Sequence, residues 1–146
     1  MENFDQLKLQ NQLCFPLYAC AKEVVRRYKP FLDPLDLTYT QYIAMMALWE
    51  EGELAVKDLG GRLYLDSGTL TPVLKKLEAK GYITRRRSEA DEREVLLSVT
   101  EAGMALREKA AAVPFAMGAC IDVTPEDAVK LRELLYKVLN GLSKEE

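Results

Sequence analysis

The chain has 146 residues, of which 49% are hydrophobic and 29% are charged, so it is long enough to bury one sizeable core and we expect a single domain over residues 1–146. It contains three cysteines and no histidine, which excludes His-based metal sites, His-based catalytic triads and a structural zinc site with four cysteine ligands. The net charge is −3, no apolar stretch approaches the roughly 20 residues that span a bilayer, and the N-terminus lacks the basic start of a signal peptide, so we expect a cytoplasmic protein with no metal or cofactor.

The first predicted helix runs from Leu7 to about Tyr28. Pro16 is expected to bend it, and Pro34, with an aspartate on either side at positions 33 and 36, is expected to mark the break that follows. Apolar side chains recur at steps of three and four residues, the period of a helix with one apolar face: Leu13, Leu17, Cys20, Val24 and Tyr28.

A second helix is predicted over residues 39–50. Thr38 and Gln41 are spaced as a capping box at its start, and Gly52 ends it. A short helix over residues 55–63 follows.

A further helix over residues 67–80 is predicted to begin at a cap formed by Asp66 or Ser67. Gly81 ends this helix, because glycine commonly follows the last helical residue.

Two strands and two helices complete the chain. Strand-forming residues at 82–84 and 95–99 flank a charged turn at 87–94, which predicts a two-stranded hairpin. A helix is expected from Thr100 to about Met117. The last helix begins at Pro125 and ends near Gly141.

This order of elements is that of a winged helix-turn-helix module. The predicted fold class is therefore mainly α with a small β-hairpin. Residues 38–99 form the expected DNA-binding part, and residues 1–33 and 100–146 form a helical part on either side of it.

The middle of the chain is basic although the whole chain is acidic. The net charge is −3 for residues 1–56, +2 for residues 57–94 and −2 for residues 95–146. Within residues 75–87, six lysines and arginines stand against Glu78 alone. Such a run is usually a solvated helix face followed by a charged turn, but a concentrated basic patch also suits nucleic acid.

The winged helix-turn-helix order favours the second interpretation. A helix that enters the major groove needs polar side chains near its start, which are here Ser67, Thr69 and Thr71. Lysines further along can meet phosphates: Lys75, Lys76 and Lys80. The wing carries Arg85, Arg86, Arg87 and Arg93, and Asp91 is placed to orient the Arg93 guanidinium for a narrow minor groove. A surface ion pair at a mobile turn is the alternative for these two residues.

The sequence resembles the MarR-type transcriptional regulators in three segments: Leu63 to Glu78, Asp91-Glu92-Arg93, and Leu97 to Thr100. Within these it is most similar to the organic-hydroperoxide-sensing repressors, in Leu13-Cys14-Phe15, Tyr28-Lys29-Pro30, Leu37-Thr38-Tyr39 and Gln41-Tyr42. The resemblance implies a homodimer whose N- and C-terminal helices interlock, with two recognition helices on palindromic double-stranded operator DNA.

The same resemblance implies a role for Cys14 as the redox sensor. In these repressors the matching cysteine is hydrogen-bonded by two tyrosines, which Tyr28 and Tyr39 match, and Asp66 matches a residue that couples the sensor to the DNA-binding part. A phenol can donate a hydrogen bond to a thiolate. Considered alone, Cys14 would be a small buried hydrophobic residue and the tyrosines would be packing residues.

The other two cysteines differ in their expected roles. Cys20 lies six residues beyond Cys14 on the same predicted helix, about 9 Å along its axis and on another face, and we interpret it as a packing residue. Some members of the family carry a second cysteine near the position of Cys120 that forms an intersubunit disulfide with the sensor. Cys120 is thus the candidate resolving residue of a two-cysteine type. An inert loop thiol is the alternative.

The function we expect is repression that ends when an organic hydroperoxide oxidises Cys14. One alternative is a MarR-type repressor released by a noncovalent phenolic or aromatic ligand, with Cys14 only lining the pocket. Another is a thiol peroxidase that uses Cys14 and Cys120. An enzyme would leave the helix-turn-helix and the basic hairpin without a purpose, so we expect that the protein is not an enzyme.

Overall fold

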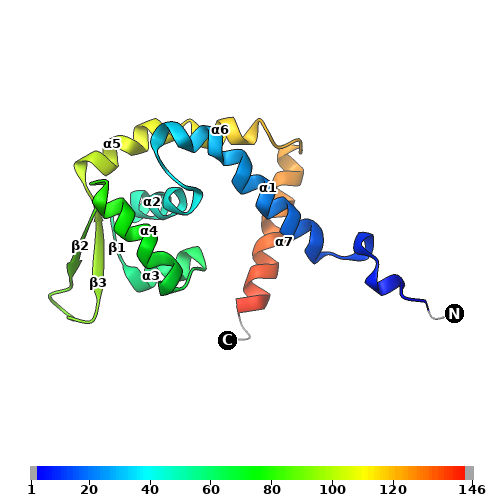
Figure 1. Ribbon diagram of the computed structural model, residues 1–146, viewed down its shortest axis with the longest axis horizontal. Helices are drawn as coiled ribbons and strands as arrows, with labels where there is room; N and C mark the ends of the chain where they lie inside the picture. Colours follow the sequence, from blue (N-terminus) through cyan, green and yellow to red (C-terminus); the bar gives the residue numbers. More distant parts are fainter. Residues whose placement is uncertain (1–2, 144–146) are drawn as a thin grey trace. The chain divides into compact units, whose positions relative to one another are not determined.

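A computed structural model describes residues 3–143 of the chain, which divide into two compact units on either side of the Pro114–Phe115 bond (Figure 1). The architecture is mainly helical with one small antiparallel sheet, which confirms the predicted fold class. The helices and strands are α1 (Cys14–Leu32), α2 (Tyr39–Glu51), β1 (Glu53–Ala55), α3 (Val56–Leu63), α4 (Ser67–Ala79), β2 (Ile83–Arg87), β3 (Val95–Val99), α5 (Glu101–Ala110), α6 (Val113–Gly118) and α7 (Pro125–Ser143).

The first helix begins later than the apolar pattern predicts. Residues 5–7 and 9–11 form two single 3₁₀ turns, and Gln12, whose backbone is extended, donates from its side chain to the carbonyl oxygens of Gln6 and Lys8, both at 2.8 Å. The helix therefore starts at Cys14 and continues past Tyr28 to Leu32. Pro16 falls in the first turn, where a missing N–H costs no intrahelical hydrogen bond.

The capping box at the start of α2 is confirmed. Thr38 Oγ1 accepts a hydrogen bond from the Gln41 backbone N–H at 3.2 Å, and Gln41 Oε1 accepts one from the Thr38 N–H at 3.1 Å. The helix ends at Gly52, whose φ of 78° lies in the region that favours glycine.

The core of the first unit lies between α2, α3, α4 and the sheet. Its fully buried large side chains include Met45, Leu48, Leu59, Leu70, Leu74, Leu77, Ile83 and Leu97. On α4 these residues recur at steps of four and three, so that the opposite face of the helix stays free for polar contacts.

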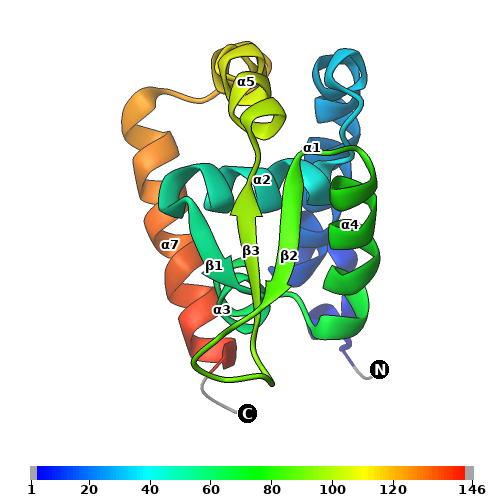
Figure 2. The ribbon, with the colours of Figure 1, turned by 90° about the vertical axis from the view of Figure 1, so that its left-hand side faces the viewer.

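The sheet has three strands rather than the predicted two. Strand β3 lies between β1 and β2, and both pairs are antiparallel (Figure 2). In the expected hairpin Ile83 pairs with Val99 and Arg87 with Val95. The missed strand β1 is three residues long and pairs Glu53 with Ser98, so it is too short to show an alternating pattern in the sequence.

The helix predicted from Thr100 to Met117 is two helices, with a break at residues 111 and 112. Pro114 explains the break, because it has no N–H to donate to the carbonyl of Ala110. The final helix begins at Pro125 as predicted, with Thr124 Oγ1 accepting from the Asp127 N–H at 3.1 Å. Across residues 3–143 no helix is both long and apolar enough to span a membrane.

Candidate nucleic-acid interface and thiol site

Helix α4 begins at a carboxylate cap. Asp66 Oδ1 accepts a hydrogen bond from the Thr69 backbone N–H at 2.7 Å. Hydrogen bonding by Thr69 lowers the pKa of Asp66 below its ordinary value of 3.8, so that the carboxylate stays charged beside the helix N-terminus. Asp66 thus fixes where α4 starts.

The solvent-facing side of α4 carries the polar residues that the sequence assigned to DNA. Ser67, Thr69, Lys75 and Lys76 are exposed. Thr71 is half-buried, and its hydroxyl donates to the carbonyl oxygen of Ser67 at 2.7 Å. The Thr71 hydroxyl proton is therefore already used within the helix, whereas the two lysines can reach phosphates.

Lys80 is placed differently from the other two lysines. Its Nζ donates to the carbonyl oxygen of Asp36 and to Gln41 Oε1, the latter at 3.1 Å, and lies 3.4 Å from Asp36 Oδ2. The ammonium group has three N–H donors and three oxygens around it. Lys80 is consequently committed to the turn at Asp36 and to the first turn of α2 rather than turned to a phosphate.

Two of the three consecutive arginines of β2 are paired with carboxylates at the base of the wing. Arg85 Nε lies 3.5 Å from Glu78 Oε1. Arg86 Nη2 donates to Glu53 Oε2 at 3.0 Å, and the same oxygen accepts from the Ser98 hydroxyl at 2.7 Å. The Ser98 and Arg86 hydrogen bonds lower the pKa of Glu53, and this carboxylate joins all three strands.

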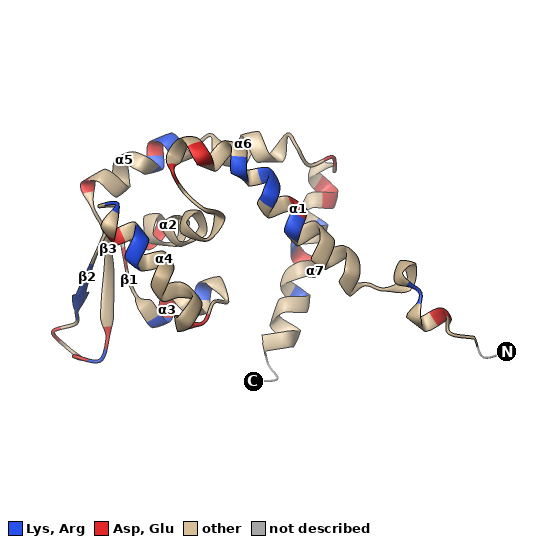
Figure 3. Cartoon of the chain, viewed as in Figure 1, with Lys and Arg blue, Asp and Glu red and all other residues tan. Residues whose placement is uncertain are grey.

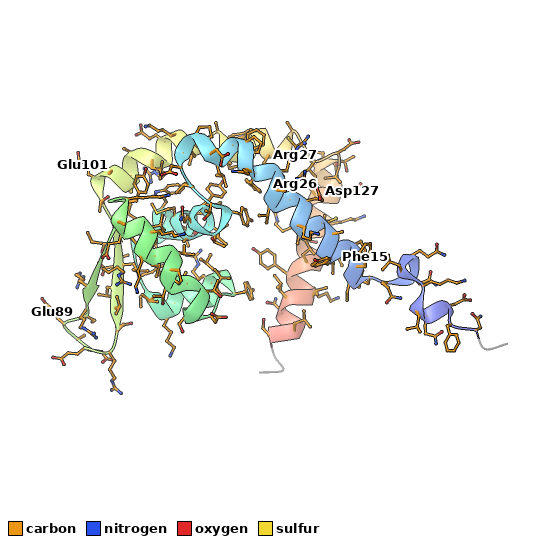
Figure 4. The ribbon with its side chains drawn as sticks, viewed as in Figure 1. Phe15, Arg26, Arg27, Glu89, Glu101 and Asp127 are labelled. Atoms are coloured by element: carbon orange, nitrogen blue, oxygen red, sulfur yellow. The ribbon has the colours of Figure 1, made fainter. Side chains whose placement is uncertain are left out.

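The loop between β2 and β3 is the tip of the wing, where Glu89 is labelled (Figure 4). Asp91 Oδ1 accepts from the Arg93 backbone N–H at 3.0 Å and lies 3.6 Å from Arg93 Nε. Arg87 Nη1 donates to the Glu92 carbonyl oxygen at 2.8 Å. The side chain of Arg93 is 94% exposed, so it has free access to a partner.

These charges follow the elements expected to meet DNA. Figure 3 shows lysines and arginines on α4 and β2. The sequence treated all of them alike, but the structure leaves Lys75 and Lys76 exposed, whereas Lys80, Arg85 and Arg86 contact carboxylates of the same chain. Arg93 also lies near a carboxylate, that of Asp91, but its side chain stays 94% exposed.

Cys14 is the first residue of α1 and is exposed. The apolar and aromatic side chains next to it are also exposed, with exposed fractions of 71% for Leu13, which precedes the helix, and 43% for Phe15 and 61% for Tyr18 on α1. Phe15 is labelled in Figure 4. Tyr28 lies fourteen residues further along the same helix, about 21 Å away at 1.5 Å per residue. Within one chain the thiol and this phenol are therefore not brought together.

The two tyrosines that the sequence singled out lie side by side in a cluster of three. The ring centroids are 4.9 Å apart for Tyr28 and Tyr39, 5.7 Å for Tyr28 and Tyr42, and 6.3 Å for Tyr39 and Tyr42. Burial raises the pKa of all three, that of Tyr42 to about 12. Tyr42 was not among the expected site residues, although its spacing of three from Tyr39 places both on one face of α2.

The remaining cysteines are also exposed. We expected Cys20 to be a packing residue, but its side chain is exposed on α1 in the single chain. Cys120 follows α6, and its Sγ donates to the carbonyl oxygen of Ala116 at 3.5 Å. The described residues contain no group of three potential metal ligands.

Comparison with known proteins gives concordant results. The family model described as "Transcriptional regulator SarA/Rot" matches residues 26–110. The chain is 52% identical over 143 residues to the organic hydroperoxide resistance transcriptional regulator of Bacillus subtilis (strain 168), covering 97% of each chain. None of these matches is described as an enzyme.

The fold is similar to that of AbfR of Staphylococcus epidermidis. Overoxidised AbfR bound to DNA matches with a TM-score of 0.77 and 34% identity, over 94% of this chain and 97% of that one. AbfR with a disulfide matches with a TM-score of 0.65 and 33% identity, over 92% and 95%. Similarity thus extends over nearly the whole chain and includes the winged helix.

Proposed function

Because the chain belongs to the MarR-type winged helix-turn-helix transcriptional regulators, among the organic-hydroperoxide-sensing repressors, we propose a mechanism for its control. Oxidation of Cys14 by an organic hydroperoxide releases the protein from its operator DNA. The observation that carries this proposal is the 52% identity, over 97% of the chain, to a regulator of organic hydroperoxide resistance. The exposed thiol among exposed apolar side chains at the start of α1 supports it, since an organic peroxide needs both access and an apolar contact.

The protein would bind its operator as a homodimer. Both α1 and α7 carry large apolar side chains that a single chain leaves exposed, which on α1 include Tyr18 and Val25 and on α7 include Leu134, Tyr136 and Leu142. Exposed apolar stripes of this kind are typical of subunit interfaces. Two copies related by a two-fold axis would present two α4 helices to successive major grooves.

The tyrosine donors for Cys14 would come from the second copy. The length of α1 keeps Cys14 about 21 Å from Tyr28 of its own chain, so a hydrogen bond between them requires two α1 helices that run in opposite directions. In that arrangement Cys14 faces the partner subunit's Tyr28 and the partner subunit's Tyr39. The sensing site is then complete only in the dimer.

The chemistry begins with the Cys14 thiolate. Its sulfur attacks one oxygen of the hydroperoxide, the O–O bond breaks, and the remaining alkoxide takes up a proton and leaves as an alcohol. The sulfur is oxidised to sulfenic acid and the peroxide is reduced. The phenols of the tyrosine cluster are protonated at neutral pH and can donate to the sulfur, since burial raises their pKa values further above the ordinary value of 10.0.

Cys120 of the partner subunit would then resolve the sulfenic acid. Its thiolate attacks the Cys14 sulfur, a disulfide forms, and hydroxide leaves and is protonated to water. Cys120 is exposed and follows a helix end, and AbfR has been solved with a disulfide. Two cellular thiols reduce the bond again and become a disulfide themselves, which resets the switch.

Only a small displacement of α4 is needed for release. Loss of one bidentate base contact costs about 1.4 kcal/mol, which corresponds to about a tenfold loss in affinity. The wing and α4 must both stay in register with the DNA, so a rotation of one subunit is sufficient.

An operator titration tests the proposal. A duplex selected from a random library by the reduced protein is titrated with wild type, Cys14→Ser and Cys20→Ser, with and without cumene hydroperoxide. Wild type and Cys20→Ser should lose the duplex on oxidation, whereas Cys14→Ser should bind it in both conditions. Mass spectrometry of residues 14 and 120 identifies the oxidised species. Release of Cys14→Ser by the hydroperoxide would refute Cys14 as sensor, and its release by a phenolic compound alone would favour a ligand-controlled repressor.

A further inference from the structure

The end of the recognition helix is tied to the segment that carries Tyr39. Lys80 directly follows α4, and its side chain is only 26% exposed. Its Nζ donates to the carbonyl oxygen of Asp36 and to Gln41 Oε1 and lies near the Asp36 carboxylate. These partners are about forty residues earlier in the chain, on both sides of Tyr39.

The oxygen that Gln41 offers to Lys80 also forms part of the cap of α2. Gln41 Oε1 accepts from the Thr38 N–H at 3.1 Å and from Lys80 Nζ at 3.1 Å, and Gln41 is 3% exposed. Asp36 has a positive φ of 53°, so its carbonyl is directed by a tight turn rather than by a helix. Any movement of the first turn of α2 therefore changes the surroundings of the Lys80 ammonium.

We propose that Lys80 is a positioning residue that transmits movement of the first turn of α2, where Tyr39 lies, to the recognition helix α4. This inference rests on the proposed function, in which Tyr39 donates a hydrogen bond to the partner subunit's Cys14 and is displaced when that sulfur is oxidised. The hydrogen bond from the Lys80 ammonium to Gln41 Oε1 is partly buried, and a charged hydrogen bond of this kind is costly to leave unmade. When the turn at Asp36 and Gln41 shifts, α4 follows it, because the helix behaves as a rigid element.

This role differs from the phosphate contact that the sequence suggested for Lys80. A phosphate contact adds equally to binding in both redox states and raises the salt dependence of binding. A positioning contact changes the ratio of the two affinities. The two roles are therefore separable by measuring operator binding in both states.

The first experiment compares three substitutions in the full-length protein: Lys80→Met, Lys80→Arg and, as a control on the exposed face of α4, Lys76→Met. For Lys80→Met we expect Cys14 to be oxidised at the wild-type rate but the loss of operator affinity on oxidation to be about tenfold smaller, which corresponds to about 1.4 kcal/mol of coupling. Lys80→Arg should retain the wild-type ratio because arginine can donate to the same oxygens. Lys76→Met should weaken binding in both states and leave the ratio unchanged.

Two results would overturn the proposal. One is a wild-type ratio in Lys80→Met, and the other is a uniform loss of affinity with a reduced salt dependence, as for a phosphate contact.

A second measurement needs no peroxide and so separates this proposal from the sensor function. Coupling between two sites is reciprocal, so operator binding should slow hydrogen exchange at the Gln41 and Tyr42 amides, which donate to Thr38. This slowing should persist in Lys80→Arg and disappear in Lys80→Met. Equal slowing in Lys80→Met would refute the coupling even if the wild type responds to peroxide. If the wild type does not respond to peroxide but the slowing depends on Lys80, the sensor proposal fails and the coupling stands.

Discussion

Tyr28, near the end of α1, and Tyr39, the first residue of α2, lie with their ring centroids 4.9 Å apart. The chain between them turns through Asp33–Leu35, a 3₁₀ turn, and through the positive φ of Asp36. This contact joins the helix that begins at Cys14 to the first helix of the expected DNA-binding part. Tyr42 packs against both rings.

The tyrosine cluster predicts a loss of stability at alkaline pH. Burial raises the pKa of Tyr42 from 10.0 to about 12, so between these values the folded protein holds a proton that the unfolded chain has lost. The stabilising contribution is complete below pH 10 and is lost as the pH rises through about 12. Urea unfolding at a series of pH values should show this fall, and Tyr42→Phe should reduce it. Tyr64→Phe, an exposed ring outside the cluster, should keep the wild-type slope.

The elements that the sequence predicted correctly have strong local signals. The capping box of Thr38 and Gln41 lies within four residues, and the Asp66 cap precedes a helix with an apolar period. The apolar spacing before Cys14 was misleading, because those residues form 3₁₀ turns held by the side chain of Gln12.

Sequence selected the candidate site residues by type but did not reveal the partners that the fold gives them. Sequence grouped Lys80 with the other lysines of its helix, because its oxygen partners lie at Asp36 and Gln41. In the same way, Glu53 holds Arg86 from a strand that the pattern did not reveal. Pairing over such distances depends on the fold, and no local periodicity encodes it.

The close packing around Gly103, in the first turn of α5, predicts that only glycine fits at this position. A Cβ atom there would overlap the carbonyl oxygen of Tyr82 and lie 2.7 Å from Val99 Cγ1. The carbonyl oxygen of Gly103 accepts a hydrogen bond from Trp49 Nε1 at 2.9 Å. Gly103→Ala should therefore lower the free energy of unfolding by about 1–3 kcal/mol, measured by urea denaturation. Gly61→Ala on α3 meets no atom within 4 Å and should be neutral or stabilising, so an equal loss in both would contradict the explanation.

The exposure of Arg93 at the tip of the wing predicts that the wing strengthens DNA binding. Its guanidinium is exposed and is oriented by Asp91, so Arg93→Ala should weaken operator binding by about 1–3 kcal/mol. Arg93→Lys should recover part of the charge but not the fork geometry. Fluorescence anisotropy at several salt concentrations measures both. Arg107→Ala, an exposed change on α5, serves as the control. If Arg93→Ala binds the operator as tightly as Arg107→Ala, the wing contact is refuted.

Cys120 predicts a covalent dimer after oxidation. Wild type and Cys20→Ser treated with cumene hydroperoxide should migrate as a dimer on a non-reducing gel, whereas Cys120→Ser and Cys14→Ser should migrate as monomers. Cys120→Ser can still be oxidised at Cys14, which mass spectrometry should show as a sulfenic acid or a mixed disulfide with an added thiol. A dimer band that survives in Cys120→Ser would exclude this pairing.

The separation of Cys14 from Tyr28 within α1 predicts that sensing is shared between subunits. Homodimers of Tyr28→Phe/Tyr39→Phe should oxidise at Cys14 about a hundredfold more slowly, because they lose two donors to a charged sulfur that are each worth about 1.5 kcal/mol. A mixed dimer pairs one chain that carries Tyr28→Phe/Tyr39→Phe with one chain that carries Cys14→Ser. Its single Cys14 thiol then meets intact tyrosines only if those tyrosines belong to the other chain. That mixed dimer should therefore react at the wild-type rate at its single Cys14. If the thiol used the tyrosines of its own chain, the mixed dimer would react as slowly as the double tyrosine variant.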